Sequence, residues 1–270
     1  MTEPRVSFAP GTDLAAQVAA AVAVLQREGV VVLDDLTDPA LLARAWGEIA
    51  SGYPDLARED RVNNYGPYDG RHTMPMVIAG TLAEKAVLLP PPVAQIAAAL
   101  LGDTFAVNSV GLLVAFADAP EQPQHPDALL FPGTPLDRVL PPFALAFAQP
   151  LLPLDEVTGR TAFWRGSHRT APPEGLWDYA PVVRPGSAIL WDYRVWHAGL
   201  ANHSGAPRPV IFATLCREWW VEIEPVAAVQ YIKLKLARHV HDAMSPKWRQ
   251  RFRRALIVDP MPDGNADVEN

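Results

Sequence analysis

The sequence predicts a mainly β fold with flanking α-helices. Between residues 104 and 217, short runs of β-forming residues alternate with turn-forming residues, which is typical of an all-β core of short strands. Helical patterns occupy much of 12–101 before this region and about 226–257 after it. The chain has 270 residues and shows no internal repeat or low-complexity linker. We therefore expect a single domain, 1–270, with a substantial core.

The first part of the chain shows two helical segments separated by a short strand. Residues 14–28 are Ala-rich with helical spacing of apolar residues, and Gly29 is a common helix stop. The apolar run 30–33 predicts a short buried strand. Asp38 and the proline after it provide the cap and the first turn of a second helix, over 40–49.

Residues 51–80 lack periodicity and are rich in polar and aromatic side chains. A long irregular stretch in a compact domain is often a lid or a binding loop. A plain surface connection explains the pattern equally well. If the segment is a lid, its side chains should select the substrate, and we name Asn64, Tyr65, Arg71 and His72 as the candidate contacts.

The core strands are expected where apolar runs are bounded by turn residues. A third helix over 92–101, ended by Gly102, precedes them. We expect strands at 105–117, 128–131, 143–152, 161–164, 187–192 and 209–216. Helical patterns at 230–241 and 246–256 follow. A two-sheet jelly roll is one way to close such a set of strands, but the pattern alone does not select it.

Composition and charge exclude several classes of protein. The net charge of −7 argues against a nucleic-acid partner. A single cysteine, Cys216, excludes an intrachain disulfide. The first residues lack the basic and apolar segments of a signal peptide, and apolar runs such as 107–117 are too short to span a bilayer. We expect a cytoplasmic monomer or homodimer with no membrane partner.

Two histidines and one carboxylate form a candidate metal site. His125 and Asp127 are two residues apart, so in extended chain their side chains point to the same side. His197 ends a strand-like aromatic run and can supply the third ligand. Such a set suits one face of a ferrous ion and leaves positions open for a co-substrate and dioxygen. We call His125, Asp127 and His197 the metal triad. The His-x-Asp pattern of residues 125–127 is by itself weak evidence for a metal site, because it also occurs by chance.

Four motifs follow one another in the centre of the chain. Residues 121–127 contain Q-x-x-H-x-D, 154–161 an acidic turn followed by Gly-Arg-Thr, 165–169 Arg-Gly-Ser-His-Arg, and 185–208 Trp-His-Ala-Gly and a later arginine. Together they resemble the phytanoyl-CoA dioxygenase family of Fe(II)- and 2-oxoglutarate-dependent oxygenases, with an arginine where proline is usual in the third motif. The resemblance implies a double-stranded β-helix core (a cupin-like jelly roll) at about 104–217.

The resemblance also implies the chemistry of the site. Fe(II) would be held by the metal triad, with 2-oxoglutarate at two further positions and dioxygen at the last. Oxidative decarboxylation would then give succinate, carbon dioxide and an oxidant that abstracts a substrate hydrogen. Gln122 and Thr161 stand where the family places polar contacts to 2-oxoglutarate. His168 belongs to a structural turn in this resemblance and is not a ligand.

Arg208 is the candidate partner for the distal carboxylate of 2-oxoglutarate. Arginine offers a permanent charge and a bidentate geometry that matches a carboxylate. Arg208 follows His197 by 11 residues, across the turn-rich segment 202–205. A hairpin centred on that segment would place the two residues nearly opposite each other on paired strands.

We therefore expect a dioxygenase that hydroxylates, desaturates or cyclises at a C–H bond of a small organic molecule, either a secondary metabolite or an amino-acid-derived compound. Asp127 argues against halogenation, since related halogenases lack this carboxylate. One alternative is a metal-dependent jelly-roll enzyme that does not use 2-oxoglutarate; Arg208 and Gln122 argue against it. The other is a non-catalytic jelly-roll binding protein, which would gain nothing from an intact metal triad.

Overall fold

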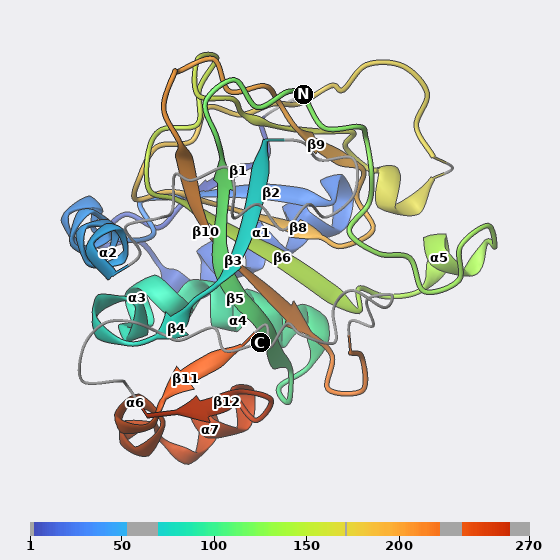
Figure 1. Cartoon of the computed structure of the whole chain (residues 1–270). Helices are drawn as coiled ribbons and strands as arrows, with labels where there is room; N and C mark the ends of the chain where they lie inside the picture. Colours follow the sequence, from blue (N-terminus) through green and yellow to red (C-terminus); the bar gives the residue numbers. More distant parts are fainter. Residues whose placement is uncertain (1–2, 53–69, 171, 222–233, 260–270) are drawn as a thin grey trace.

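The computed structural model describes residues 3–52, 70–170, 172–221 and 234–259, and its centre is a large, mostly antiparallel sheet (Figure 1). Within these residues its seven strands, in spatial order, are β1 Arg5–Ser7, β2 Val30–Asp34, β8 Ala188–Asp192, β6 Ala144–Pro150, β10 Arg208–Cys216, β5 Ala106–Ala115 and β3 Arg71–Pro75. Among the described strands of this sheet, only β1 and β2 pair in parallel. Four of the six expected core runs therefore contain strands of this sheet, and a fifth, 161–164, contains a strand of a smaller one.

A smaller sheet faces the inner surface of the large one. It pairs β7 Thr161–Phe163 with β9 His197–Gly199, and a further β-bridge joins His125 to His197. Phe163 packs in one apolar cluster with Ala146 and Trp191 of the large sheet. Two sheets that enclose a common core in this way form the expected jelly roll.

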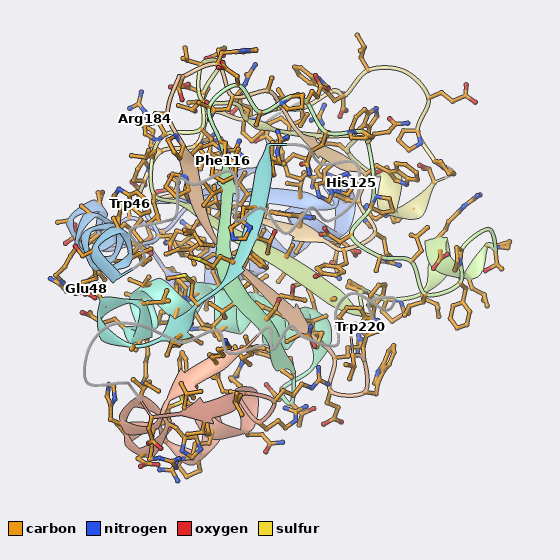
Figure 2. The ribbon with its side chains drawn as sticks, in the orientation of Figure 1. Trp46, Glu48, Phe116, His125, Arg184 and Trp220 are labelled. Atoms are coloured by element: carbon orange, nitrogen blue, oxygen red, sulfur yellow. The ribbon has the colours of Figure 1, made fainter. Side chains whose placement is uncertain are left out.

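Helices cover the outer face of the large sheet. α1 Leu14–Glu28 and α4 Pro91–Leu101 share one apolar cluster with outward-facing residues of the large sheet, and α2 Pro39–Gly52 packs against β5 and β10. In Figure 2 the labelled Trp46 and Glu48 mark α2, whereas His125 lies beside β9. The short helical segments are η2 Gly80–Ala83, α3 Lys85–Leu88, α5 Leu136–Val139 and η3 Ser167–Arg169. Among the described residues, no helix has the length and apolarity to cross a bilayer.

The C-terminal part differs from the expected pair of helices. β11 Lys235–Ala237 pairs with β4 Val77–Ile78 and with β12 Leu256–Val258, so the middle of the first expected helix and the last residue of the second lie in strands. α6 Arg238–Ala243 and α7 Pro246–Arg251 are shorter than expected. These elements lie together at the bottom of Figure 1. The start of the helix expected at 230–241 lies outside the described residues.

Two other expectations were wrong. The segment 71–78 is not an irregular loop, because β3 pairs with β5 at the edge of the large sheet. Residues 128–131 form no strand. Instead, the Ala128 N–H donates to the carbonyl of Tyr193, and the Phe131 N–H donates to the side chain of Asp137. A side chain thus takes the place of a partner strand.

The end of α1 is held by the turn at 166–169. Gly29 closes the helix in the left-handed region at φ 80°, and its N–H donates to Leu25. His168 Nε2 lies 3.2 Å from the carbonyl of Gln26, and the Gly166 N–H donates to the carbonyl of Glu28 at 2.7 Å. These contacts satisfy carbonyls that a helix end leaves unpaired. His168 is therefore a structural residue here.

Replacing Gly29 with alanine is expected to lower the free energy of unfolding by about 2–4 kcal/mol. A Cβ atom at this position would lie 2.5 Å from His168 Nδ1 and 2.5 Å from Val195 Cγ2, in addition to the strained backbone. Gly11→Ala is the matched control, since Gly11 also has a positive φ of 87° but open space around it. Urea unfolding of both variants measures the difference; equal losses would contradict the packing argument.

Candidate active site

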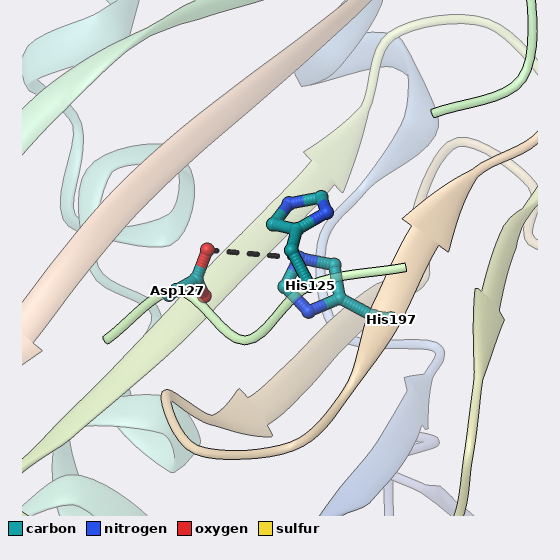
Figure 3. A group of neighbouring side chains, drawn as sticks. All are labelled: His125, Asp127 and His197. Carbon is teal, nitrogen blue, oxygen red and sulfur yellow. Dashed lines mark ion pairs between the residues drawn. The ribbon is translucent and has the colours of Figure 1, made fainter. Parts of the chain in front are cut away.

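The three residues of the metal triad converge between the two sheets. His125 and Asp127 lie on the segment beside β9, and His197 is the first residue of β9 (Figure 3). Their ligand atoms all lie within 4.8 Å of one another. One ion could bridge this span after small side-chain rotations, given ligand distances of about 2.0–2.2 Å. The sequence prediction that these side chains meet is confirmed.

Backbone hydrogen bonds fix the triad in place. The His125 N–H donates to the His197 carbonyl at 3.0 Å, and the His197 N–H donates back at 2.9 Å. Each imidazole also has Nδ1 near a carbonyl, of Pro123 at 2.8 Å and of Val195 at 3.1 Å. A carbonyl can only accept, so Nδ1 carries the proton and Nε2 keeps the lone pair. This tautomer is the one that a metal-binding histidine needs.

Burial sets the protonation of the site. It lowers the pKa of His197 to about 4 and lowers that of His125, so both imidazoles are neutral at neutral pH. Burial raises the pKa of Asp127 to about 6. The 3.6 Å separation of His197 Nε2 and Asp127 Oδ1, dashed in Figure 3, is therefore not an ion pair at neutral pH. Two neutral imidazoles and a carboxylate are the donor set that a ferrous ion accepts.

Polar side chains gather beside Gly199, two residues after His197 on β9. The Gly199 N–H donates to Gln122 Oε1 at 2.9 Å. Thr161 pairs with Gly199 on β7, and Arg71 reaches the Gly199 carbonyl from β3. A Cβ atom at Gly199 would lie 2.6 Å from Gln122 Oε1 and 3.3 Å from Arg71 Nη2. The absent side chain therefore makes room for these groups next to the metal triad.

Arg208 and Arg71 are two buried cations at this end of the site. Both pair in register with Ala115 of β5, one on each side, and they are 3% and 4% exposed. Burial lowers the pKa of each to about 10, and Arg71 adds to the shift of Arg208. Arg208 donates to the Gly159 carbonyl, whereas its Nε has no hydrogen-bond partner among the residues that the structure describes. Within the described residues no carboxylate forms an ion pair with either arginine.

The connection between His197 and Arg208 is not the expected hairpin. β9 pairs with β7 in the small sheet, whereas β10, which begins at Arg208, pairs with β5 and β6. The intervening residues cross from one sheet to the other. Asn202, which is fully buried, holds this crossing by donating to the carbonyls of Ala115 and Phe116. Arg208 thus approaches the site from the opposite sheet.

The structure describes two of the four candidate substrate residues, and one of these two lies at the site. Arg71 lies at the site, but as a buried strand residue and not as part of a lid. His72 follows it on β3, so its side chain points to the opposite face of the sheet. Asn64 and Tyr65 lie outside the described residues.

For Trp191 the sequence allows packing around the site but favours a plain core position in a strand. Its indole Nε1 donates to Asp127 Oδ2 at 2.9 Å, and its ring centroid lies 5.3 Å from that of His197. The signal was its position six residues before His197, but aromatic residues in strands are usually plain core.

Solved structures of several other proteins share this fold. One is the epimerase SnoN of nogalamycin biosynthesis, in complex with Fe3+, alpha-ketoglutarate and nogalamycin RO; it is 20% identical, with a TM-score of 0.58, over 82% of this chain and 91% of that one. Another is EctD from S. alaskensis with 2-oxoglutarate and 5-hydroxyectoine, 22% identical, with a TM-score of 0.54, over 80% and 83%. AviO1 from Streptomyces viridochromogenes Tue57 is 18% identical, with a TM-score of 0.56, over 76% and 97%.

A family model covers most of the chain. The model for phytanoyl-CoA dioxygenase (PhyH) matches residues 25–210, which include α2, the metal triad and Arg208. The family match and the convergent triad agree with the motifs found in the sequence. The chain therefore belongs to the phytanoyl-CoA dioxygenase family and is a 2-oxoglutarate-dependent oxygenase.

Proposed function

We propose that the protein is an Fe(II)- and 2-oxoglutarate-dependent dioxygenase that hydroxylates a C–H bond of a small organic molecule. The observation that carries the proposal is a site with two complementary ends. At one end the metal triad converges within 4.8 Å. At the other, Arg208 is buried with an unpartnered Nε. Desaturation or cyclisation would use the same residues.

The metal triad fits Fe(II). His125 and His197 each offer a neutral Nε2, and Asp127 offers Oδ1. Bound Fe(II) would supply the oxidative decarboxylation of 2-oxoglutarate by dioxygen and the hydrogen abstraction from substrate. The protein itself orients the co-substrate and the substrate at the metal, excludes water from the site and prevents competing reactions.

The two arginines fit a dicarboxylate. A buried guanidinium without a carboxylate is destabilised, and a bound anion relieves that cost. Arg208 would hold the distal carboxylate of 2-oxoglutarate, and Arg71 would add a second positive charge beside it. Thr161 can add a hydroxyl contact. Gln122 Oε1 accepts from the Gly199 N–H, which orients the side-chain amide, and its NH2 group would donate to the ligand.

The substrate side is the exposed edge of the site. The side chain of Asp127 is 24% exposed, whereas that of His197 is 7% exposed, so substrate would approach from the Asp127 side. A secondary metabolite or an amino-acid-derived compound is the class we favour. The ligands named for SnoN and EctD, nogalamycin RO and 5-hydroxyectoine, support a small-molecule substrate.

Anaerobic titration tests the proposal. Fe(II) followed by 2-oxoglutarate should give a weak visible charge-transfer band, because the band requires both on one metal. His197→Ala should abolish it. His203→Ala is the matched control, since His203 lies six residues further on, is exposed and should leave the band intact. A wild-type protein that binds Fe(II) without developing the band would contradict the proposal.

A further inference from the structure

The carboxylate of Asp127 is divided between two contacts. Its Oδ1 lies 3.6 Å from His197 Nε2, on the side where the triad converges. Its Oδ2 accepts a hydrogen bond from Trp191 Nε1 at 2.9 Å. We propose that Trp191 is a positioning residue that reserves Oδ2, so that Asp127 binds the metal through Oδ1 alone. This inference rests on the proposed function.

Trp191 is firmly held in this position. It lies on β8 of the large sheet and is 8% exposed. Its ring centroid lies 5.3 Å from that of His197 and 5.7 Å from that of Phe163, in the small sheet. The hydrogen bond to Asp127 therefore spans the gap between the sheets. The indole cannot swing away without opening a void in the core.

The chemistry of indole suits this task. Its Nε1–H can only donate, so Trp191 cannot itself become a metal ligand. Its side chain is neutral, so it holds Oδ2 without competing with a cation for the charge of the carboxylate. A lysine or arginine at this place would form an ion pair with Asp127 and weaken its attraction for the metal.

The number of open positions on the metal depends on this hydrogen bond. Two imidazoles and a carboxylate bound through one oxygen leave three positions of an octahedron open. A carboxylate bound through both oxygens leaves only two. 2-Oxoglutarate and dioxygen together need three. Trp191 thereby preserves the position that the second co-substrate requires.

Trp191→Phe removes the N–H and keeps most of the ring. Trp220→Phe is the matched control, because Trp220 is also 8% exposed and belongs to the same apolar cluster, yet packs against Phe143 and Tyr193 and not against the triad. The probe is Mn(II), bound anaerobically in place of iron. Water-proton relaxation then counts the exchangeable waters on the metal, before and after 2-oxoglutarate.

The wild type and Trp220→Phe should hold three waters, of which 2-oxoglutarate displaces two. In Trp191→Phe the relaxation per bound Mn(II) should fall by about one third, since one position is lost, and 2-oxoglutarate should leave no water. Equal relaxation in all three proteins would overturn the inference.

One outcome can be measured on the wild-type protein alone. A wild type with only two waters before 2-oxoglutarate would show that Asp127 already binds through both oxygens, which overturns the role of Trp191. Failure of the proposed function is a separate result. In that case Mn(II) would bind His197→Ala as tightly as wild type, and the metal triad would not be the metal site.

Discussion

His197→Ala and Asp127→Ala are each expected to weaken Fe(II) binding by more than about 100-fold. Loss of a residue that only hydrogen-bonds to a metal ligand already lowers metal affinity by about 10–100-fold, and these substitutions remove a ligand itself. Turnover should fall below detection. Each variant leaves only two protein ligands on the metal, and water replaces the third without holding it in place. Anaerobic equilibrium dialysis with Fe(II) measures the affinity directly.

The fold should survive both substitutions. The bridge between His125 and His197 uses backbone N–H and carbonyl groups, which alanine retains. Far-UV circular dichroism should therefore match the wild type, and His203→Ala should keep full Fe(II) affinity. Full activity in either triad variant would refute the metal assignment, whatever the fold.

The elements that could be predicted from sequence are those with strong local signals. α1 has a capping Asp13 and a left-handed Gly29, and α4 has prolines in its first turn. β5, β6 and β10 are mostly apolar on both faces because helices cover one face of the large sheet and the small sheet covers the other. The metal triad was also predictable, since each ligand lies in a motif of recognisable order.

The errors came where tertiary partners override local pattern. β3 lies at the edge of the large sheet, where a strand that contains a proline is tolerated, and the sequence alone gives no sign that β5 is available as its partner. The three-residue strand β11 pairs with β12 and with β4, which lies far away in the sequence, so no local pattern marks these strands. Loop-like composition between His197 and Arg208 likewise fits either a hairpin or a crossing between sheets.

The pairing of β3 with β5 changes the role that is expected of Arg71. In an irregular lid it would select substrate. On β3 it is buried and fixed, with Nη2 donating to the carbonyls of Gly199 and Leu200 at 3.1 and 3.0 Å. We therefore place it with Arg208 at the proposed co-substrate end, and in this proposal other residues on the Asp127 side select the substrate.

Arg208→Met is expected to weaken 2-oxoglutarate binding by about 2–5 kcal/mol, which is a loss of roughly 30- to 5,000-fold. Methionine has a similar length and no charge, so the substitution removes a charge-assisted bidentate partner from a buried site. The affinity for Fe(II) alone should stay within about threefold of wild type, because Arg208 is not a ligand of the metal.

The stability of the ligand-free protein separates this explanation from simple damage. Arg208 is a buried cation without a carboxylate among the described residues, and it donates to one carbonyl, that of Gly159. Removal of the buried charge should offset the loss of that bond, so Arg208→Met should unfold at the wild-type temperature or above it. Arg71→Met should instead lower stability, because the carbonyls of Pro120, Gly199 and Leu200 lose their donor.

Saturating 2-oxoglutarate with Mn(II) should raise the melting temperature of wild type and of the exposed control Arg27→Ala by several degrees, and of Arg208→Met hardly at all. If Arg208→Met keeps the full ligand-induced rise, another residue binds the distal carboxylate, and the unpartnered Nε of Arg208 has a different purpose.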